Sequence, residues 1–133
     1  MHSTRGGAAY GREFDGTLSW FANPASQVSA HVVFGVDGRR ARVVDDENAA
    51  WHAGLHNATW LGAELEQPFP GQTIFGVQYD MLREWLLEMS AKYHIPLDAQ
   101  HVVEHKDMPQ GIMVGKSDVG YPFDMQRLLE GLS

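Results

Sequence analysis

The sequence contains no cysteine, and this absence excludes several kinds of chemistry. A chain without cysteine has no disulfide, no thiol nucleophile and no metal site with sulfur ligands. The sequence also has no apolar run close to the ~20 residues that a membrane-spanning helix needs. Its first residues lack the apolar segment of a signal peptide. We therefore expect synthesis in the cytoplasm and no insertion into a membrane.

Basic residues are scarce as well. Ten Lys and Arg stand against 17 Asp and Glu, so the formal net charge is −7. This balance argues against a general nucleic-acid or anionic-membrane binder. The length of 133 residues suits one domain, and the sequence shows neither repeats nor an interdomain linker. We expect residues 1–133 to form a single domain, to bind no nucleic acid and to be a monomer.

The spacing of apolar residues predicts a mixture of strands and helices. Residues 13–22 favour a short helix that ends before Pro24. A long amphipathic helix is expected to begin at Thr73 or Gly76 and to end at Tyr93. Two β-branched runs joined by Asp37-Gly38 predict a hairpin. Shorter elements are expected in three further places: strands at 60–66 and 102–103, and a final helix at 123–132. This order predicts a mixed α/β (α+β) fold with a central mixed sheet flanked by helices.

Histidine and carboxylate side chains concentrate between His101 and Asp118, a stretch interrupted by Pro and Gly. These side chains are ligands that zinc selects. The alternative is a polar surface loop without a ligand. Residues 101–105 also spell H-x-x-E-H, the inverted motif of some zinc proteases. That motif requires a helix, and its two central valines and the nearby prolines argue against one.

Several short motifs, in order along nearly the whole chain, resemble those of the type 2 N-acetylmuramoyl-L-alanine amidases. This zinc family includes amidase-type phage lysozymes (endolysins) and resembles animal peptidoglycan recognition proteins. Each motif is weak alone, but their shared order is specific. The segments that carry the resemblance are His2-Ser-Thr4, Ser29-Ala-His31, Asp37-Gly38, Ala50-Trp-His-Ala-Gly54, Leu61-Gly-Ala-Glu-Leu-Glu66, His105-Lys-Asp107 and Lys116-Ser-Asp118-Val-Gly120.

The resemblance implies a role for each matching residue. It implies zinc ligands that leave a fourth position open, as in catalytic sites: His2, His105 and Asp118. It implies that Glu64 is the general base and that Lys116 stabilises the oxyanion. It also implies substrate contacts from the cleft wall by His31, Trp51 and His52. The first strand is expected to be truncated, because only Met1 precedes His2.

The bond cut would be the amide between the lactyl group of N-acetylmuramic acid and L-alanine, in peptidoglycan or a muropeptide. The setting would be a phage endolysin or a bacterial wall-lytic enzyme that acts on the cell wall after release. A cytosolic amidase that recycles soluble muropeptides is one alternative. A peptidoglycan-binding module that keeps the fold without catalysis is another. Ala30 occupies the position where some relatives carry Tyr, so a Tyr-assisted mechanism is not expected.

Overall fold

The centre of the molecule is a four-stranded mixed sheet with the strand order β1-β4-β2-β3. The structure is a computed structural model, and it describes residues 1–132. Three strands run parallel: β1 (His2–Ser3), β4 (Ala63–Leu65) and β2 (Val32–Phe34). The edge strand β3 (Arg40–Arg42) is antiparallel to β2. The expected central mixed sheet is therefore confirmed.

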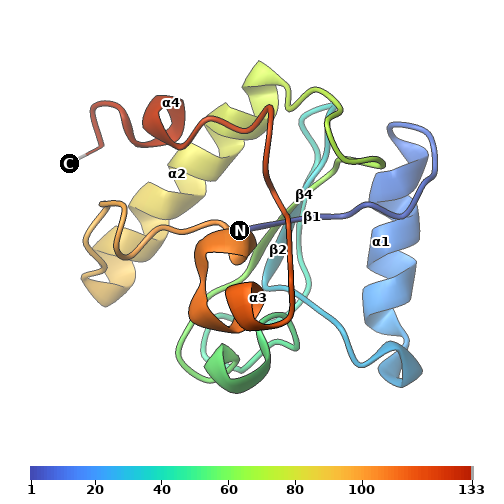
Figure 1. Ribbon diagram of the computed structural model, residues 1–133, viewed down its shortest axis with the longest axis horizontal. Coiled ribbons are helices and arrows are strands. Elements are labelled where there is room, and N and C mark those ends of the chain that lie inside the picture. Colours follow the sequence, from blue (N-terminus) through green and yellow to red (C-terminus); the bar gives the residue numbers. More distant parts are fainter. Residues whose placement is uncertain (133) are drawn as a thin grey trace.

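The two longer helices lie on opposite sides of this sheet, as Figure 1 shows for α1 (Arg12–Ala22) and α2 (Gly76–Tyr93). The main core forms between α2 and the sheet, where the ring centroids of Phe34 and Trp85 are 6.3 Å apart. Leu82 is fully buried in the same cluster. Burying one such side chain contributes about 1.5–3 kcal/mol. This packing makes the sheet a rigid support for the residues on its other face.

Alternation along β4 decides which side chains face away from α2. Ala63 and Leu65 belong to the core beside α2, so Glu64 between them faces the opposite side. His2 is aligned with Glu64 in the parallel pairing of β1 and β4. The pleat of two neighbouring strands thus brings an imidazole and a carboxylate to the same face of the sheet.

A buried carboxylate connects the start of α1 to the sheet. Glu66, directly after β4, accepts hydrogen bonds from the backbone N–H groups of Gly11 (2.6 Å), Phe14 (3.0 Å) and Val36 (2.9 Å). The N-cap residue Gly11 offers no side-chain cap of its own. Glu66 therefore satisfies amide groups that a helix start leaves without partners. Through these bonds α1 is held in place where it forms one wall of the cleft described below.

Short elements complete the chain. In order they are η1 (Pro24–Ser26), η2 (Gly54–His56), η3 (His105–Asp107), α3 (Pro109–Met113) and α4 (Met125–Leu129). Asp124 caps the start of α4, because its side chain accepts a hydrogen bond from the N–H of Arg127. None of the helices within residues 1–132 has the length and apolar character needed to cross a bilayer.

The longer predicted elements are confirmed and the shorter ones need correction. The hairpin and both longer helices form as expected, whereas the strand predicted at 60–66 covers only Ala63–Leu65 and the final helix is shorter than 123–132. The strand predicted at 102–103 is wrong. The backbone N–H groups of His101 and Val102 both bond to the carbonyl of Asp98, so this segment forms a turn.

Candidate metal centre and catalytic cleft

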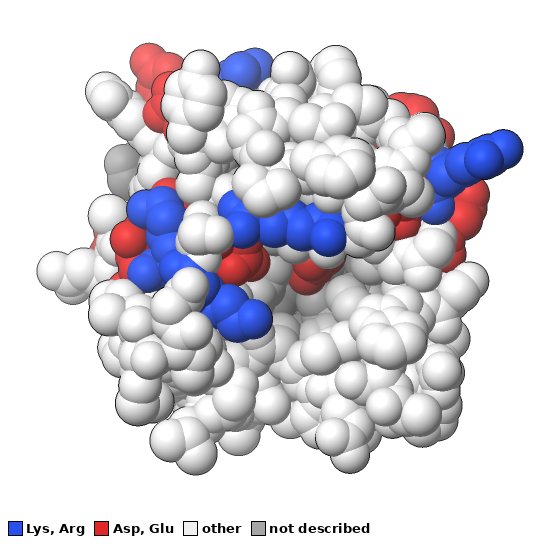
Figure 2. Space-filling model, turned by 45° about the vertical axis from the view of Figure 1, so that its right-hand side comes forward, with Lys and Arg blue, Asp and Glu red and all other residues white. Residues whose placement is uncertain are grey.

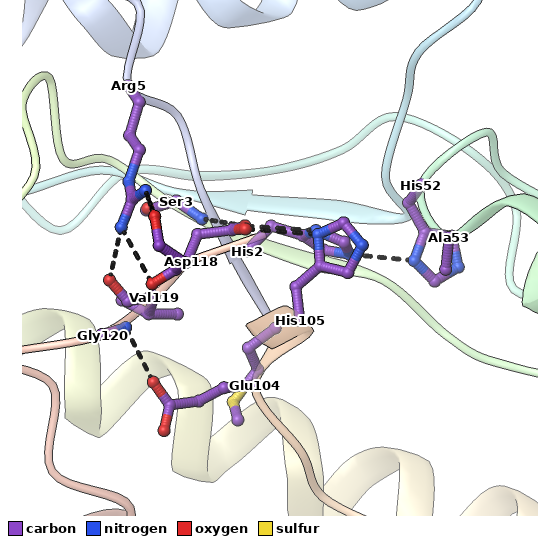
Figure 3. Close-up of polar contacts among 12 residues, drawn as sticks. His2, Ser3, Arg5, His52, Ala53, Glu104, His105, Asp118, Val119 and Gly120 are labelled. Carbon is purple, nitrogen blue, oxygen red and sulfur yellow. Dashed lines mark hydrogen bonds and ion pairs between the residues drawn. The ribbon is translucent and has the colours of Figure 1, made fainter. Parts of the chain in front are cut away.

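Three buried side chains from distant parts of the sequence converge on one point, as Figure 3 shows for His2, His105 and Asp118. The Nδ1 atoms of His2 and His105 are 3.0 Å apart. Oδ2 of the Asp118 carboxylate lies 3.5 Å from Nδ1 of His2, and its other oxygen, Oδ1, lies 3.3 Å from Nδ1 of His105. Zinc in a tetrahedral site has bonds of ~2.0–2.1 Å, which place its donor atoms roughly 3.3 Å apart. The observed distances between the two imidazoles and the carboxylate, 3.0–3.5 Å, are close to that spacing.

Backbone hydrogen bonds bring these three residues together. The N–H of His105 donates to the carbonyl of Met1 at 2.9 Å, which places the start of η3 beside β1. The N–H of Lys106 donates to the carbonyl of Asp118 at 2.8 Å. The N–H of Ser3 points at the Asp118 carboxylate, at 3.4 Å. The site is therefore fixed by main-chain pairing and not by the ligand side chains alone.

Two further charged residues hold the Asp118 loop from either side, and the sequence analysis assigned this role to neither of them. Arg5 donates to the Ser117 hydroxyl at 2.6 Å and to the Val119 carbonyl at 2.8 Å (Figure 3). Glu104 accepts a hydrogen bond from the N–H of Gly120 at 2.8 Å. Neither residue has a sequence signal of its own, because each bond joins segments that are far apart in the chain.

The protonation states of the site suit a metal. Burial lowers the pKa of His2 to about 3, so its imidazole is neutral at pH 7. Burial acts to raise the pKa of Asp118, but its interactions with the nearby His105 and His2 outweigh it and hold that pKa well below its usual range. A neutral imidazole and an ionised carboxylate are the forms that bind metal ions. The group could therefore hold a metal.

Glu64 lies in the same cleft as the three converging residues. Burial raises the pKa of its carboxyl to about 8, and the negative charge of Asp118 acts in the same direction. Within residues 1–132 no protein group donates a hydrogen bond to this carboxylate. Glu64 can therefore gain or lose a proton without breaking a hydrogen bond within the described part of the fold.

The raised pKa predicts how the stability of the metal-free protein depends on pH. A carboxyl with pKa near 4.5 when unfolded and about 8 when folded stabilises the fold below pH 4.5, and this contribution is lost as the pH rises through 8. The free energy of unfolding should therefore fall by up to ~1.4 kcal/mol per pH unit because of this group, and Glu64→Gln should abolish that fall. Urea unfolding of the zinc-free wild type and of the variant between pH 5 and 8 measures this pH dependence. If the free energy of unfolding depended on pH equally in wild type and Glu64→Gln, the burial argument would be contradicted. Glu84→Gln, at an exposed position, is the matched control.

The group formed by His2, His105 and Asp118 lies in an open cleft of about 380 Å³. Figure 2 shows a hollow in the surface with acidic side chains inside it and basic side chains along its edge. Lys116 and Arg5 are the basic residues that line the cleft, and Trp51 and His52 line it as well. The indole of Trp51 is half-exposed, so a flat apolar surface is available to a ligand. The structure thus gathers most of the sequence-predicted site residues around one cavity.

His31 and His101 lie outside this cleft. His31 is fully buried, accepts a hydrogen bond from the N–H of Gly62 at 2.9 Å and donates to the Asn48 carbonyl at 2.7 Å. His101 is exposed and bonds to Asp98 at 2.7 Å. Because residues 101–104 form no helix, the H-x-x-E-H motif does not have the geometry of a zinc protease site.

Fold and site together define a mixed α/β domain with a buried His-His-Asp group in an open cleft. A family model described as N-acetylmuramoyl-L-alanine amidase matches residues 7–120, so the chain belongs to that family. The matched range includes Glu64, His105, Lys116 and Asp118. His2 precedes it, and its place in the site rests on the geometry above.

A curated relative agrees with the family. The chain is 40% identical over 65 residues to N-acetylmuramoyl-L-alanine amidase A of Achromobacter lyticus. The matched stretch is 48% of this chain and 33% of that protein, so the chain spans about a third of the length of the curated relative. No solved structure gives a significant match.

Proposed function

We propose that residues 1–133 form the catalytic domain of a zinc-dependent N-acetylmuramoyl-L-alanine amidase that acts as a monomer. The reaction is hydrolysis of the amide between the lactyl group of N-acetylmuramic acid and L-alanine. The observation that carries the proposal is the triangle of His2, His105 and Asp118 donors, 3.0–3.5 Å apart, with the buried Glu64 carboxylate in the same cleft. Family membership and the relative's name support the choice of bond.

Zinc is the metal that suits this donor set best. Two imidazoles and one carboxylate leave room for a fourth ligand, as catalytic zinc sites require. His2, His105 and Asp118 would hold the ion. When bound, zinc polarises a carbonyl and lowers the pKa of a bound water toward ~7. A single negative charge among the three ligands leaves the centre positively charged, which favours both effects.

Glu64 and Lys116 supply the proton and charge chemistry. Glu64 would remove a proton from the attacking water and pass that proton to the departing amine. Lys116 lines the same cleft and can place its ammonium beside the oxygen that gains charge. One such donor often contributes ~3 kcal/mol to lowering a barrier.

The cleft also suits the proposed substrate. Muropeptides carry stem-peptide carboxylates, and Arg5 and Lys116 place positive charge in a cleft of an otherwise acidic protein. Trp51 offers a half-exposed ring for a sugar or peptide face. We propose a bacteriolytic setting, as in an endolysin or a bacterial wall-lytic enzyme. A recycling amidase is the alternative, and it would prefer soluble muropeptides to intact cell wall.

Two measurements on one preparation test the proposal. After zinc reconstitution and removal of free metal, elemental analysis should give one zinc per chain. Purified peptidoglycan should then release fragments with new L-alanine amino termini, and zinc removal should stop this release. Absence of stoichiometric zinc would overturn the proposed metal centre. One zinc per chain without cleavage would instead indicate a peptidoglycan-binding module.

A further inference from the structure

Each imidazole of the metal centre has a second nitrogen, and the partner of that nitrogen decides which atom faces the metal. Nε2 of His2 lies 3.0 Å from Nδ1 of His52. Nε2 of His52 in turn lies 2.9 Å from the backbone carbonyl oxygen of Trp60. Figure 3 shows His52 on the opposite side of His2 from Asp118. The result is a linear chain of contacts from the Trp60 carbonyl to the metal centre.

The position of every proton in this chain follows from the carbonyl at its end. A carbonyl oxygen only accepts, so Nε2 of His52 carries a proton and donates it to Trp60. In a neutral imidazole the other nitrogen, Nδ1, then has only a lone pair. The contact at 3.0 Å therefore requires that Nε2 of His2 carry the proton and donate to His52. Nδ1 of His2 is left with a lone pair that points at His105 and Asp118.

The local structure leaves the His52 ring little freedom to turn. The N–H groups of His52 and Ala53 both donate to the side-chain oxygen of Asn57, at 2.9 and 2.7 Å. The ring packs directly on Gly62, where an added Cβ would lie only 2.8 Å from its Cγ and Nδ1. Asn57 thus fixes the backbone and Gly62 supplies the space, so the imidazole is presented to His2 in one orientation.

The second imidazole has a matching arrangement. Nε2 of His105 donates to the side-chain oxygen of Gln110 at 2.8 Å, so its Nδ1 also presents a lone pair to the site. Gln110 in turn packs against Gly54, where an added Cβ would lie 3.2 Å from its Cγ. The loop that carries His52 therefore contacts the residue that orients His105. Two facing lone pairs 3.0 Å apart repel each other unless a cation lies between them.

We propose that His52 is a positioning residue of the metal centre: by accepting the Nε2 proton of His2, it fixes the tautomer in which Nδ1 of His2 binds the metal. This role differs from the substrate contact expected from the sequence. This inference depends on one part of the proposed function, namely that the site binds a metal. Partners of this kind typically change metal affinity 10–100-fold.

Two substitutions separate this role from simple packing. His52→Asn places an amide oxygen near the position of Nδ1 and keeps an acceptor for His2, whereas His52→Phe keeps a ring without an acceptor. His52→Phe should weaken zinc affinity ~10–100-fold, measured by competition with a chelator, and His52→Asn should recover most of the loss. His101→Phe, a histidine outside the cleft, is the matched control and should bind zinc as wild type does. Wild-type affinity in His52→Phe would overturn the proposal.

A second measurement needs no variant and does not depend on catalysis. Long-range proton–nitrogen NMR correlations on the zinc-loaded wild type report the tautomer of each histidine. His2 and His52 should both carry their proton on Nε2; a proton on Nδ1 of His2 would overturn the proposal, even if His52→Phe failed to fold. A chain that shows the His52-dependent zinc affinity but leaves peptidoglycan intact would refute the proposed amidase activity and leave this inference standing.

Discussion

Changing Asp118 to Ala is expected to remove metal binding and amide cleavage together. Asp118 supplies the only negative charge among the three converging donors, and its carboxylate lies within 3.5 Å of both imidazole nitrogens. Loss of a partner that merely orients a ligand weakens metal affinity ~10–100-fold, so loss of a ligand should exceed that range. Chelator competition measures the affinity, and release of L-alanine amino termini from peptidoglycan measures the activity.

The control for this experiment is a histidine only 17 positions away in the sequence. His101 is exposed and bonds to Asp98, so His101→Ala should leave both zinc affinity and cleavage close to wild type. Circular dichroism establishes that both variants are folded. If His101→Ala loses the metal while Asp118→Ala keeps it, the assignment of the ligands is wrong.

The sequence predicted those parts of the fold that local interactions determine. Asp37-Gly38 defines a tight turn, with Gly38 at φ 89°, so the hairpin could be recognised from a few residues. The apolar spacing up to Tyr93 repeats over several turns, and the helix forms over Gly76–Tyr93, from the later of the two expected starts. The strand predicted at 60–66 contains β4, where Glu64 lies between the core residues Ala63 and Leu65.

Elements fixed by contacts between distant segments were not predictable in the same way. Val102 and Val103 have the composition of a buried strand, yet the turn at Asp98 uses the backbone N–H of Val102. The helix α3 was not predicted, because five residues give too short a pattern to distinguish from a loop. Short apolar or polar runs are ambiguous until their tertiary partners are known.

The same distinction between local and long-range features applies to the candidate site. The residue types that bind zinc are visible in the sequence, and the structure brings His2, His105 and Asp118 together. The residues that support them are not visible, since the contact between Arg5 and Ser117 spans 112 positions. The hydrogen bond that His2 donates to His52 likewise depends on a ring orientation that no motif specifies.

Glu64→Gln is expected to keep the fold and the zinc but to lose most turnover. Gln has nearly the same shape as Glu and cannot accept a proton from water, so only the proposed general base is removed. Loss of a general base typically slows a reaction ~10²–10⁴-fold. Peptidoglycan cleavage at matched zinc occupancy, with zinc content measured on the same samples, gives this ratio. An enzyme as active as wild type would refute the role of Glu64.

The contrast with Glu66 makes the test specific, because the two carboxylates lie two residues apart on the same face of the sheet. Glu66 accepts three backbone hydrogen bonds at 2.6–3.0 Å, which an amide oxygen cannot replace fully. Glu66→Gln should therefore destabilise the fold by ~1–3 kcal/mol, while the folded fraction cleaves peptidoglycan normally. Glu64→Gln should show the reverse pattern at neutral pH: a stable, zinc-loaded protein without turnover. Equal losses of stability and turnover in both variants would mean that Glu64, like Glu66, serves only the structure.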